Sequence, residues 1–286
     1  MNTYTHDKET IKISFSKAAS TYDAHSTLQK TTAKYLLELI NKVAFSPTNR
    51  ECHFALDIGC GTGTLTLSFK NKYPEINLFG CDFSLPMISK AKEKIHDGSV
   101  RLLISDCDEL PFKDALFDTV ISNLTYQWVP DILSSFKEIS RTLKPGGLFL
   151  FSTLGPRTLE ELRTSLIKSE DVNGINGRID FMRFHDENSL SRNLQKAGFE
   201  ILAVENVLDK KNYKNLWDLL RTLKSTGASP PFSNGAKSLA RGLFLKKIEK
   251  YYLKHFSNSS GTGILATYSI LNIAAKKSIL KNDYSK

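Results

Sequence analysis

Short apolar runs alternate with segments of helical periodicity between Cys52 and Thr153. The apolar runs predict strands at 53–58, 77–82, 100–104, 117–122 and 147–153, and the intervening segments predict helices at 64–72, 86–96 and 131–143. Apolar strands that alternate with helices are typical of a parallel sheet covered by helices on both faces. A further helix is predicted ahead of the first strand, at 28–43.

The pattern changes after Thr153. Helical stretches are predicted at 158–170, 186–197, 213–225 and 236–256, and two β-rich runs at 199–207 and 264–274 are expected to return to the same sheet. The pattern therefore predicts an α/β fold with one Rossmann-like sheet and a helical insertion, in a single domain that spans 1–286.

Composition adds little to this picture. The chain has 286 residues, of which 41% are hydrophobic and 24% charged, as in a globular protein with a sizeable core. The polar N-terminus lacks the apolar segment of a secretion signal, and polar residues interrupt the longest apolar stretch, at 263–275. We therefore expect a soluble, cytoplasmic protein whose four cysteines, none in a CxxC pair, are reduced. No metal site is predicted.

Charge is distributed unevenly along the chain. Residues 1–153 contain 17 basic and 17 acidic residues, so the whole net charge of +9 lies in 154–286, with 22 basic and 13 acidic residues. Such an excess favours an acidic partner, which could be a nucleic acid, an anionic membrane surface or an acidic protein. A lysine-rich surface that is simply solvated is the alternative.

A glycine-rich turn follows the first predicted strand. Its spacing, Gly59-x-Gly61-x-Gly63, differs from the GxGxxG of dinucleotide sites, and Asp57 just before it would repel a phosphate but suits an ammonium group. Asp82, 25 residues after Asp57, ends the next strand, where a carboxylate can accept both hydroxyls of a ribose.

Two later features extend this candidate site. Phe83 could pack under an adenine ring, and Asp106 after the third strand could accept the adenine amino group. Taken singly, each feature has another explanation, because acidic residues at strand ends often cap helices. Their order and spacing together favour a nucleoside-containing ligand.

These motifs, with the segments 106–112 and 117–123, resemble those of class I S-adenosylmethionine-dependent methyltransferases. The resemblance implies a seven-stranded, mostly parallel sheet that binds S-adenosylmethionine across the carboxyl ends of its strands. It places the methionine moiety at Gly59 and Gly61 of the glycine turn, which also includes Gly63 as a cofactor-binding residue, the ribose at Asp82, the adenine at Asp106 and Cys107, and the sulfonium near Asn123. The expected parts are an N-terminal helical segment (1–50), a cofactor-binding core (51–153), a helical insertion or lid with the sixth strand (154–235), and a C-terminal helix with the last strand (236–286).

A narrower resemblance spans nearly the whole chain. The segments 15–23, 122–128, 151–163, 182–184 and 220–228 are similar to those of the malonyl-acyl-carrier-protein O-methyltransferases of biotin synthesis. The elements Asn-Leu-x-x-Gln-Trp and Leu-Lys-x-x-Gly-Ala discriminate best, because many methyltransferases share the glycine motif. Segment 46–52 and the basic helix at 236–256 are not diagnostic. The resemblance implies a malonyl group on acyl carrier protein as substrate, with no nucleic acid or membrane involved.

Such a substrate arrives as a carboxylate, because ordinary carboxyl groups have a pKa near 4, so no general base is required. The six histidines are scattered along the chain. The reaction needs a cation that holds the carboxylate, and Arg183 is the first candidate, followed by Lys224 and Arg221. A helix cap or a surface position is the alternative for Arg183.

Tyr22 is expected to close over the cofactor, with a packing role as its alternative. The other residues expected around the substrate are Gln127, Trp128, Phe181 and Phe184, with a position in the core as the alternative for Trp128.

Three other functions stay open at this stage. The chain could methylate another small acid or a quinone precursor, although a diffusing substrate needs no basic docking surface. It could methylate nucleic acid, although Ser122-Asn-Leu-Thr replaces the Asn-Pro-Pro-Tyr typical of such enzymes. It could also be a non-catalytic regulator that binds the cofactor, or an interaction scaffold.

Overall fold

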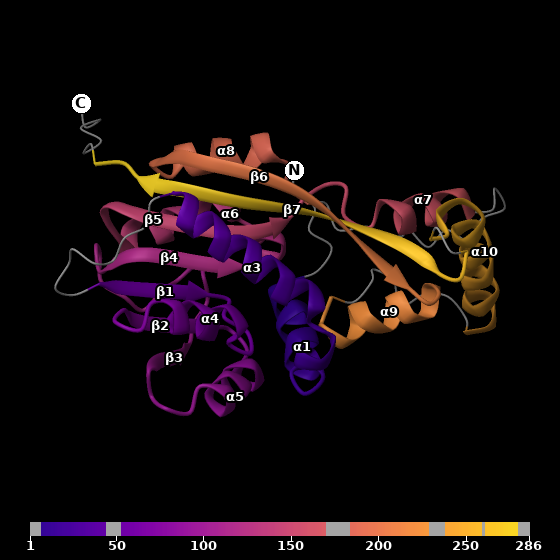
Figure 1. Cartoon of the computed structure of the whole chain (residues 1–286), viewed down its shortest axis with the longest axis horizontal. Coiled ribbons are helices and arrows are strands. Elements are labelled where there is room, and N and C mark those ends of the chain that lie inside the picture. The colour runs from indigo at the N-terminus through magenta and orange to yellow at the C-terminus, as the bar shows by residue number, and fades with distance from the viewer. Residues whose placement is uncertain (1–6, 44–52, 170–183, 229–237, 259–260, 280–286) are drawn as a thin grey trace.

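A seven-stranded sheet forms the centre of the computed structural model, which describes residues 7–43, 53–169, 184–228, 238–258 and 261–279. The strand order is β3-β2-β1-β4-β5-β7-β6 (Figure 1). β1 to β5 run parallel, and β7 is antiparallel to both of its neighbours. The strands are β1 (Phe54–Ile58), β2 (Asn77–Asp82), β3 (Val100–Ile104), β4 (Phe117–Asn123), β5 (Leu143–Leu154), β6 (Phe199–Tyr213) and β7 (Ile264–Lys277). The predicted Rossmann-like, mostly parallel sheet is confirmed.

Helices cover both faces of the sheet. On one face lie α3 (Thr27–Lys42), α4 (Thr64–Lys72) and α5 (Leu85–Lys94), and on the other lie α6 (Ile132–Thr142) and α8 (Glu187–Lys196). Alternation along β1 sends Ala55 into the core under α3 and α4, and Leu56 and Ile58 into the core under α6. Asp57 lies on the same face of β1 as Ala55, and its side chain therefore faces α4.

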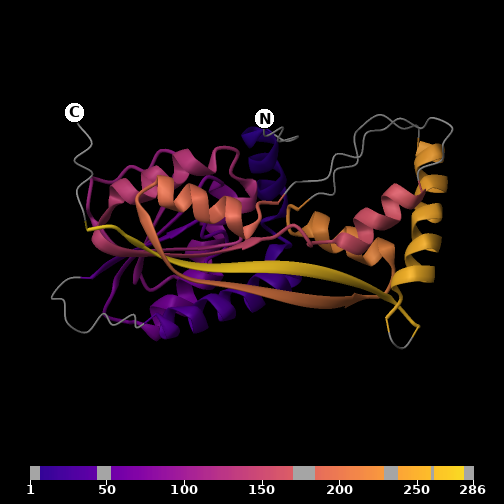
Figure 2. The same cartoon turned by 90° about the horizontal axis from the view of Figure 1, so that it is seen from above.

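A third core lies beyond the end of the sheet, where β6 and β7 continue as a two-stranded ribbon (Figure 2). Three helices pack there: α7 (Glu160–Ser169), α9 (Leu216–Ser225) and α10 (Ser238–Phe256). We call these helices, with segments 208–213 and 264–269 of the ribbon, the outer lobe. β6 is longer than the predicted 199–207, because β7 pairs with it as far as Tyr213. No helix within the described ranges has both the length and the apolar character needed to span a bilayer.

Two N-terminal helices precede α3, namely α1 (Lys8–Ala18) and α2 (Tyr22–His25). The sequence pattern predicted only the helix that corresponds to α3. The Asp7 carboxylate accepts a hydrogen bond from the Thr10 amide at 2.7 Å, which caps the start of α1. The Ser16 and Ser84 hydroxyls lie 2.9 Å apart, so α1 crosses the carboxyl end of β2.

Candidate active site

The glycine turn between β1 and α4 owes its shape to left-handed backbone conformations, with φ of 65° at Gly59 and 55° at Gly61. A Cβ atom at Gly59 would lie 2.2 Å from Thr125 Oγ1, so this glycine lets the β1 and β4 loops approach each other. A Cβ at Gly61 would meet no atom within 4 Å and would project from the wall of a pocket. At Gly63 the same atom would lie 3.0 Å from Ile95, so Gly63 serves the packing of α4 against α5.

Asp82 is fixed at the floor of this pocket. Its carboxylate accepts hydrogen bonds from the Gly61 amide at 3.0 Å and the Ser84 amide at 2.9 Å. Burial raises the pKa of Asp82 to about 6, against the effect of the two amide donors. The carboxylate is therefore oriented by backbone groups from both loops and lines the pocket, as a ribose acceptor should.

Asp57 lies behind the glycine turn and is 1% exposed. Its Oδ2 accepts a hydrogen bond from the Thr66 hydroxyl at 2.5 Å, whereas Oδ1 is buried without a partner among the described residues. Burial raises the pKa of Asp57 to about 7. Asp57 does not itself line the pocket, and its unpartnered Oδ1 is an acceptor of the kind that an ammonium group would satisfy.

The same pocket is lined by Phe83, Asp106 and Cys107, the residues that the sequence analysis expects around the adenine. The structure adds Lys8 of α1, whose Nζ lies 2.6 Å from Asp106 Oδ2 and 2.6 Å from Asp108 Oδ2. Lys8 precedes every recognised motif, so no sequence signal marked it.

A second cavity, of about 400 Å³, adjoins this pocket. Four side chains line both spaces, namely those of Phe15, Tyr22, Leu124 and Trp128. Phe15 packs edge-on against Trp128, with ring centroids 5.3 Å apart. The cofactor pocket and the cavity are therefore separated by one layer of side chains, which is the arrangement that transfer between two bound molecules requires.

Gln127 and Asn123 hold the loop after β4 at this boundary. Gln127, which is 4% exposed, donates from Nε2 to the Leu124 carbonyl at 2.6 Å and accepts from the Thr153 hydroxyl at 3.1 Å. Asn123 accepts from the Ser152 hydroxyl at 2.6 Å. Because Leu124 has φ of 54°, its conformation depends on such bonds.

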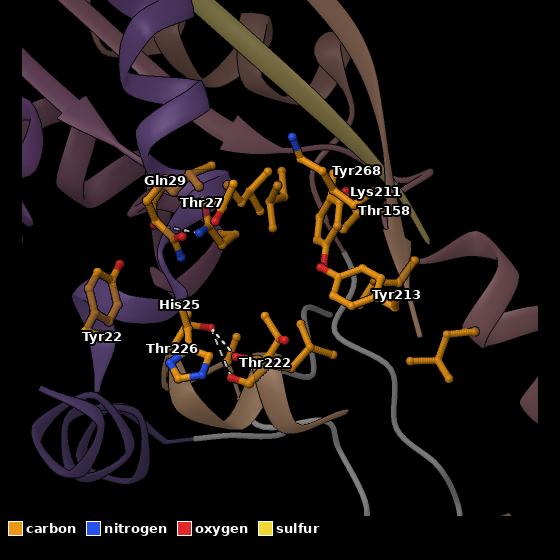
Figure 3. Close-up of a pocket in the computed structure, with 18 of the residues that line it drawn as sticks. Tyr22, His25, Thr27, Gln29, Thr158, Lys211, Tyr213, Thr222, Thr226 and Tyr268 are labelled. Atoms are coloured by element: carbon orange, nitrogen blue, oxygen red, sulfur yellow. Dashed lines mark hydrogen bonds between the residues drawn. The ribbon is translucent and has the colours of Figure 1, made fainter. Parts of the chain in front are cut away.

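The far wall of the cavity belongs to the outer lobe (Figure 3). The Tyr213 and Tyr268 hydroxyls lie 2.9 Å apart, and Lys211 is ion-paired with Asp209 at 2.8 Å. Sequence reasoning missed these residues, because 208–213 was not assigned to a strand. The alternation of Asp209, Lys211 and Tyr213 would have marked one face of it.

Only some of the residues predicted to bind the substrate line this cavity. Trp128, Gln127 and Phe184 line the cavity, whereas Arg221 and Lys224 are exposed on α9 and do not line it. Phe181 and Arg183 lie outside the described residues. Arg163 of α7 and His25 of α2 line the cavity, although the sequence analysis singled out neither.

Known proteins share both the sequence and the fold. A family model described as a methyltransferase domain matches residues 56–151. The chain is 34% identical over 267 residues to malonyl-[acyl-carrier protein] O-methyltransferase 2 of Ilyobacter polytropus, covering 93% of this chain and 96% of that relative. It is 30% identical over 279 residues to a biotin biosynthesis bifunctional protein of Teredinibacter turnerae, covering 94% of this chain and 47% of that protein. A candidate methyltransferase of Bacillus halodurans has the same fold, with a TM-score of 0.59 at 17% identity, covering 85% of this chain and 98% of that one.

A sheet of this order with its ligand pocket at the glycine turn defines a class I methyltransferase, and its cofactor is S-adenosylmethionine. Within that class, the sequence relatives named above identify the family more narrowly. The chain belongs to the malonyl-[acyl-carrier protein] O-methyltransferase family and is a carboxyl O-methyltransferase.

Proposed function

We propose that the protein transfers a methyl group from S-adenosylmethionine to the free carboxylate of a malonyl group on acyl carrier protein. The product would be the malonyl methyl ester that primes pimeloyl synthesis for biotin. The observation that carries this proposal is the cavity that adjoins the cofactor pocket across Tyr22, Leu124 and Trp128. A cytoplasmic location stays a prediction from the sequence.

The proposed reaction is an in-line displacement at the methyl carbon. The bound cofactor supplies an electrophilic methyl group on a sulfonium. A carboxylate oxygen would take this methyl group, with the electron pair of the carbon–sulfur bond left on sulfur, so no proton would have to move. Gly59, Gly61 and Asp82 would hold the cofactor, and Tyr22 and Trp128 would align the acyl group with it. Arg183 remains the cation predicted from sequence to hold the carboxylate.

The carrier would approach along the exposed face of α9. Trp217, Arg221 and Lys224 lie at positions i, i+4 and i+7, and Trp217 is 46% exposed. The opposite face of the same helix contributes Thr222 and Leu223 to the cavity wall. An acidic carrier bound here would therefore have its acyl arm next to the cavity.

Methyl transfer to a panel of substrates tests the proposal. Malonyl-acyl carrier protein, free malonate, a quinone precursor and RNA are each incubated with isotopically labelled S-adenosylmethionine, and mass spectrometry locates the label. We expect a labelled ester on the malonyl carrier, released by mild base. The Asp82→Ala variant serves as the inactive control. Labelling of another substrate, with the malonyl carrier unmodified, would contradict the proposal.

A further inference from the structure

His25 lies on the cavity wall, one helical turn after Tyr22 (Figure 3). Its Nδ1 is 3.0 Å from the Thr21 carbonyl oxygen, which accepts but cannot donate, so Nδ1 bears the hydrogen. In a neutral ring, Nε2 would then be an acceptor that repels an anion. In the imidazolium, Nε2 becomes a charged donor.

The turn that carries His25 is fixed on its other side. Asp23 accepts a hydrogen bond from the Thr62 hydroxyl at 2.6 Å and pairs with Lys94 at 2.9 Å. Thr62 belongs to the glycine turn of the cofactor pocket. The Thr21 hydroxyl also donates to the Ser225 carbonyl of α9 at 3.2 Å. The imidazole is therefore held between the cofactor turn and the outer lobe.

The other cationic side chains of the cavity wall already interact with groups of the protein. Arg163 donates to the Pro156 carbonyl at 2.8 Å, and Lys211 is paired with Asp209. Within the described part of the chain, no hydrogen bond engages Nε2 of His25. The charged and titratable groups that share the cavity with His25 are Tyr22, Arg163, Lys211, Tyr213, Asp218 and Tyr268.

We propose that His25 is a substrate-binding residue that distinguishes the acid substrate from its ester product. In the imidazolium form, Nε2–H binds one oxygen of the substrate carboxylate and leaves the other oxygen to form the bond to the methyl carbon. Methylation removes the negative charge, so the ester loses the ion pair and is released. The proposal rests on the proposed function, because the substrate must present a carboxylate.

Binding without turnover tests this role. Calorimetry in the presence of S-adenosylhomocysteine compares malonyl-pantetheine with its methyl ester, for the wild type and for His25→Gln, His25→Lys and the exposed control His96→Gln. We expect the wild type and His96→Gln to prefer the acid. His25→Gln should bind the acid about tenfold more weakly and the ester equally well, because a charge-assisted hydrogen bond is lost. His25→Lys should restore much of the preference for the acid.

Unchanged preference for the acid in His25→Gln would overturn the proposal. The same is true if Arg183→Gln abolishes that preference while His25→Gln keeps it, since Arg183 would then hold the carboxylate. Melting temperatures show whether each variant is folded. If His25→Gln is not folded, the preference of His25→Lys for the acid over the ester tests the proposal instead. Failure of the proposed function would look different, because the wild-type enzyme itself would not methylate malonyl-acyl carrier protein.

Discussion

Gly61 and Gly98 have similar backbones, with φ of 55° and 71°, and a Cβ atom at either would meet nothing within 4 Å. They differ in place, because Gly61 lines the cofactor pocket and Gly98 lies in an exposed turn. Alanine at either position should lower the free energy of unfolding by about 1–2 kcal/mol, the cost of left-handed backbone in a residue with a Cβ. Gly61→Ala should in addition lose most of its affinity for S-adenosylhomocysteine, because its methyl group occupies ligand space.

Denaturant titration and calorimetry on the two variants separate these effects. Equal affinity for the ligand in Gly61→Ala and Gly98→Ala would show that the pocket is placed wrongly. A Gly61→Val variant should bind no ligand at all.

Asp57 and Asp82 predict a pH dependence of cofactor binding. Burial raises their pKa values to about 7 and about 6, from about 4 in an unfolded chain. Between about pH 4 and pH 7 the folded protein therefore binds more protons than the unfolded chain, and these two groups lower the free energy of unfolding as pH rises. The ammonium and ribose hydroxyls of the cofactor favour the ionised carboxylates, so binding should release protons and strengthen as pH rises through this window.

Calorimetry in two buffers of different ionisation enthalpy measures the proton release. We expect S-adenosylhomocysteine to bind more tightly at about pH 7.5 than at about pH 5.5, and Asp57→Asn to weaken this dependence. Affinity that falls with rising pH would contradict the assignment of both carboxylates.

At the scale of elements, α2 is the link between the two binding spaces. Asp23→Ala removes its contacts with Thr62 and Lys94. We expect the affinity for S-adenosylhomocysteine to fall by about threefold to tenfold, because the wall that carries Tyr22 is no longer tied to the glycine turn. Glu93→Ala, which breaks the exposed Lys90–Glu93 ion pair, is the matched control and should change neither affinity nor stability measurably. Equal affinities in the two variants would remove α2 from the cofactor site.

The sequence predicted the buried strands well, because β1 is apolar at every position except Asp57 and β4 contains the apolar residues Phe117, Val120 and Ile121. It predicted α9 as a helix but expected Arg221 and Lys224 at the substrate, whereas neither residue lines the cavity. Leu216, Leu219 and Leu223 recur at helical spacing and are buried, which turns Arg221 and Lys224 outward. The sequence alone shows this spacing of apolar residues. The contact between Lys8 and Asp106 was not, because no local pattern pairs residues so far apart in the chain.

At the scale of the whole molecule, the excess of positive charge lies in the half that forms the outer lobe. If α9 guides an acidic carrier, added salt should raise the Michaelis constant for malonyl-acyl carrier protein steeply, because exposed charges are screened beyond about 8 Å at physiological ionic strength. A short malonyl thioester should show little salt dependence. The double variant Arg221→Glu/Lys224→Glu should likewise raise the Michaelis constant for malonyl-acyl carrier protein, and it should leave cofactor affinity unchanged.

Lys92→Glu/Lys113→Glu provides the control, since it alters net charge equally at exposed positions in the neutral half of the chain. Steady-state kinetics with both substrates would refute docking on α9 if the two double variants raised the Michaelis constant for the carrier alike.

The ribbon of β6 and β7 carries the outer lobe, and its pairing continues from Phe199 opposite Lys277 to Tyr213 opposite Ile264. Each residue adds about 3.4 Å to an antiparallel strand, and faces alternate with every residue. Removing two residues from each strand would therefore draw the outer lobe inward by about 7 Å while the same faces still meet, whereas removing one would turn Tyr213 and Lys211 away. The ribbon thus sets the distance between the sheet and the outer lobe, and that distance can change only in steps of two residues if the same faces are to meet.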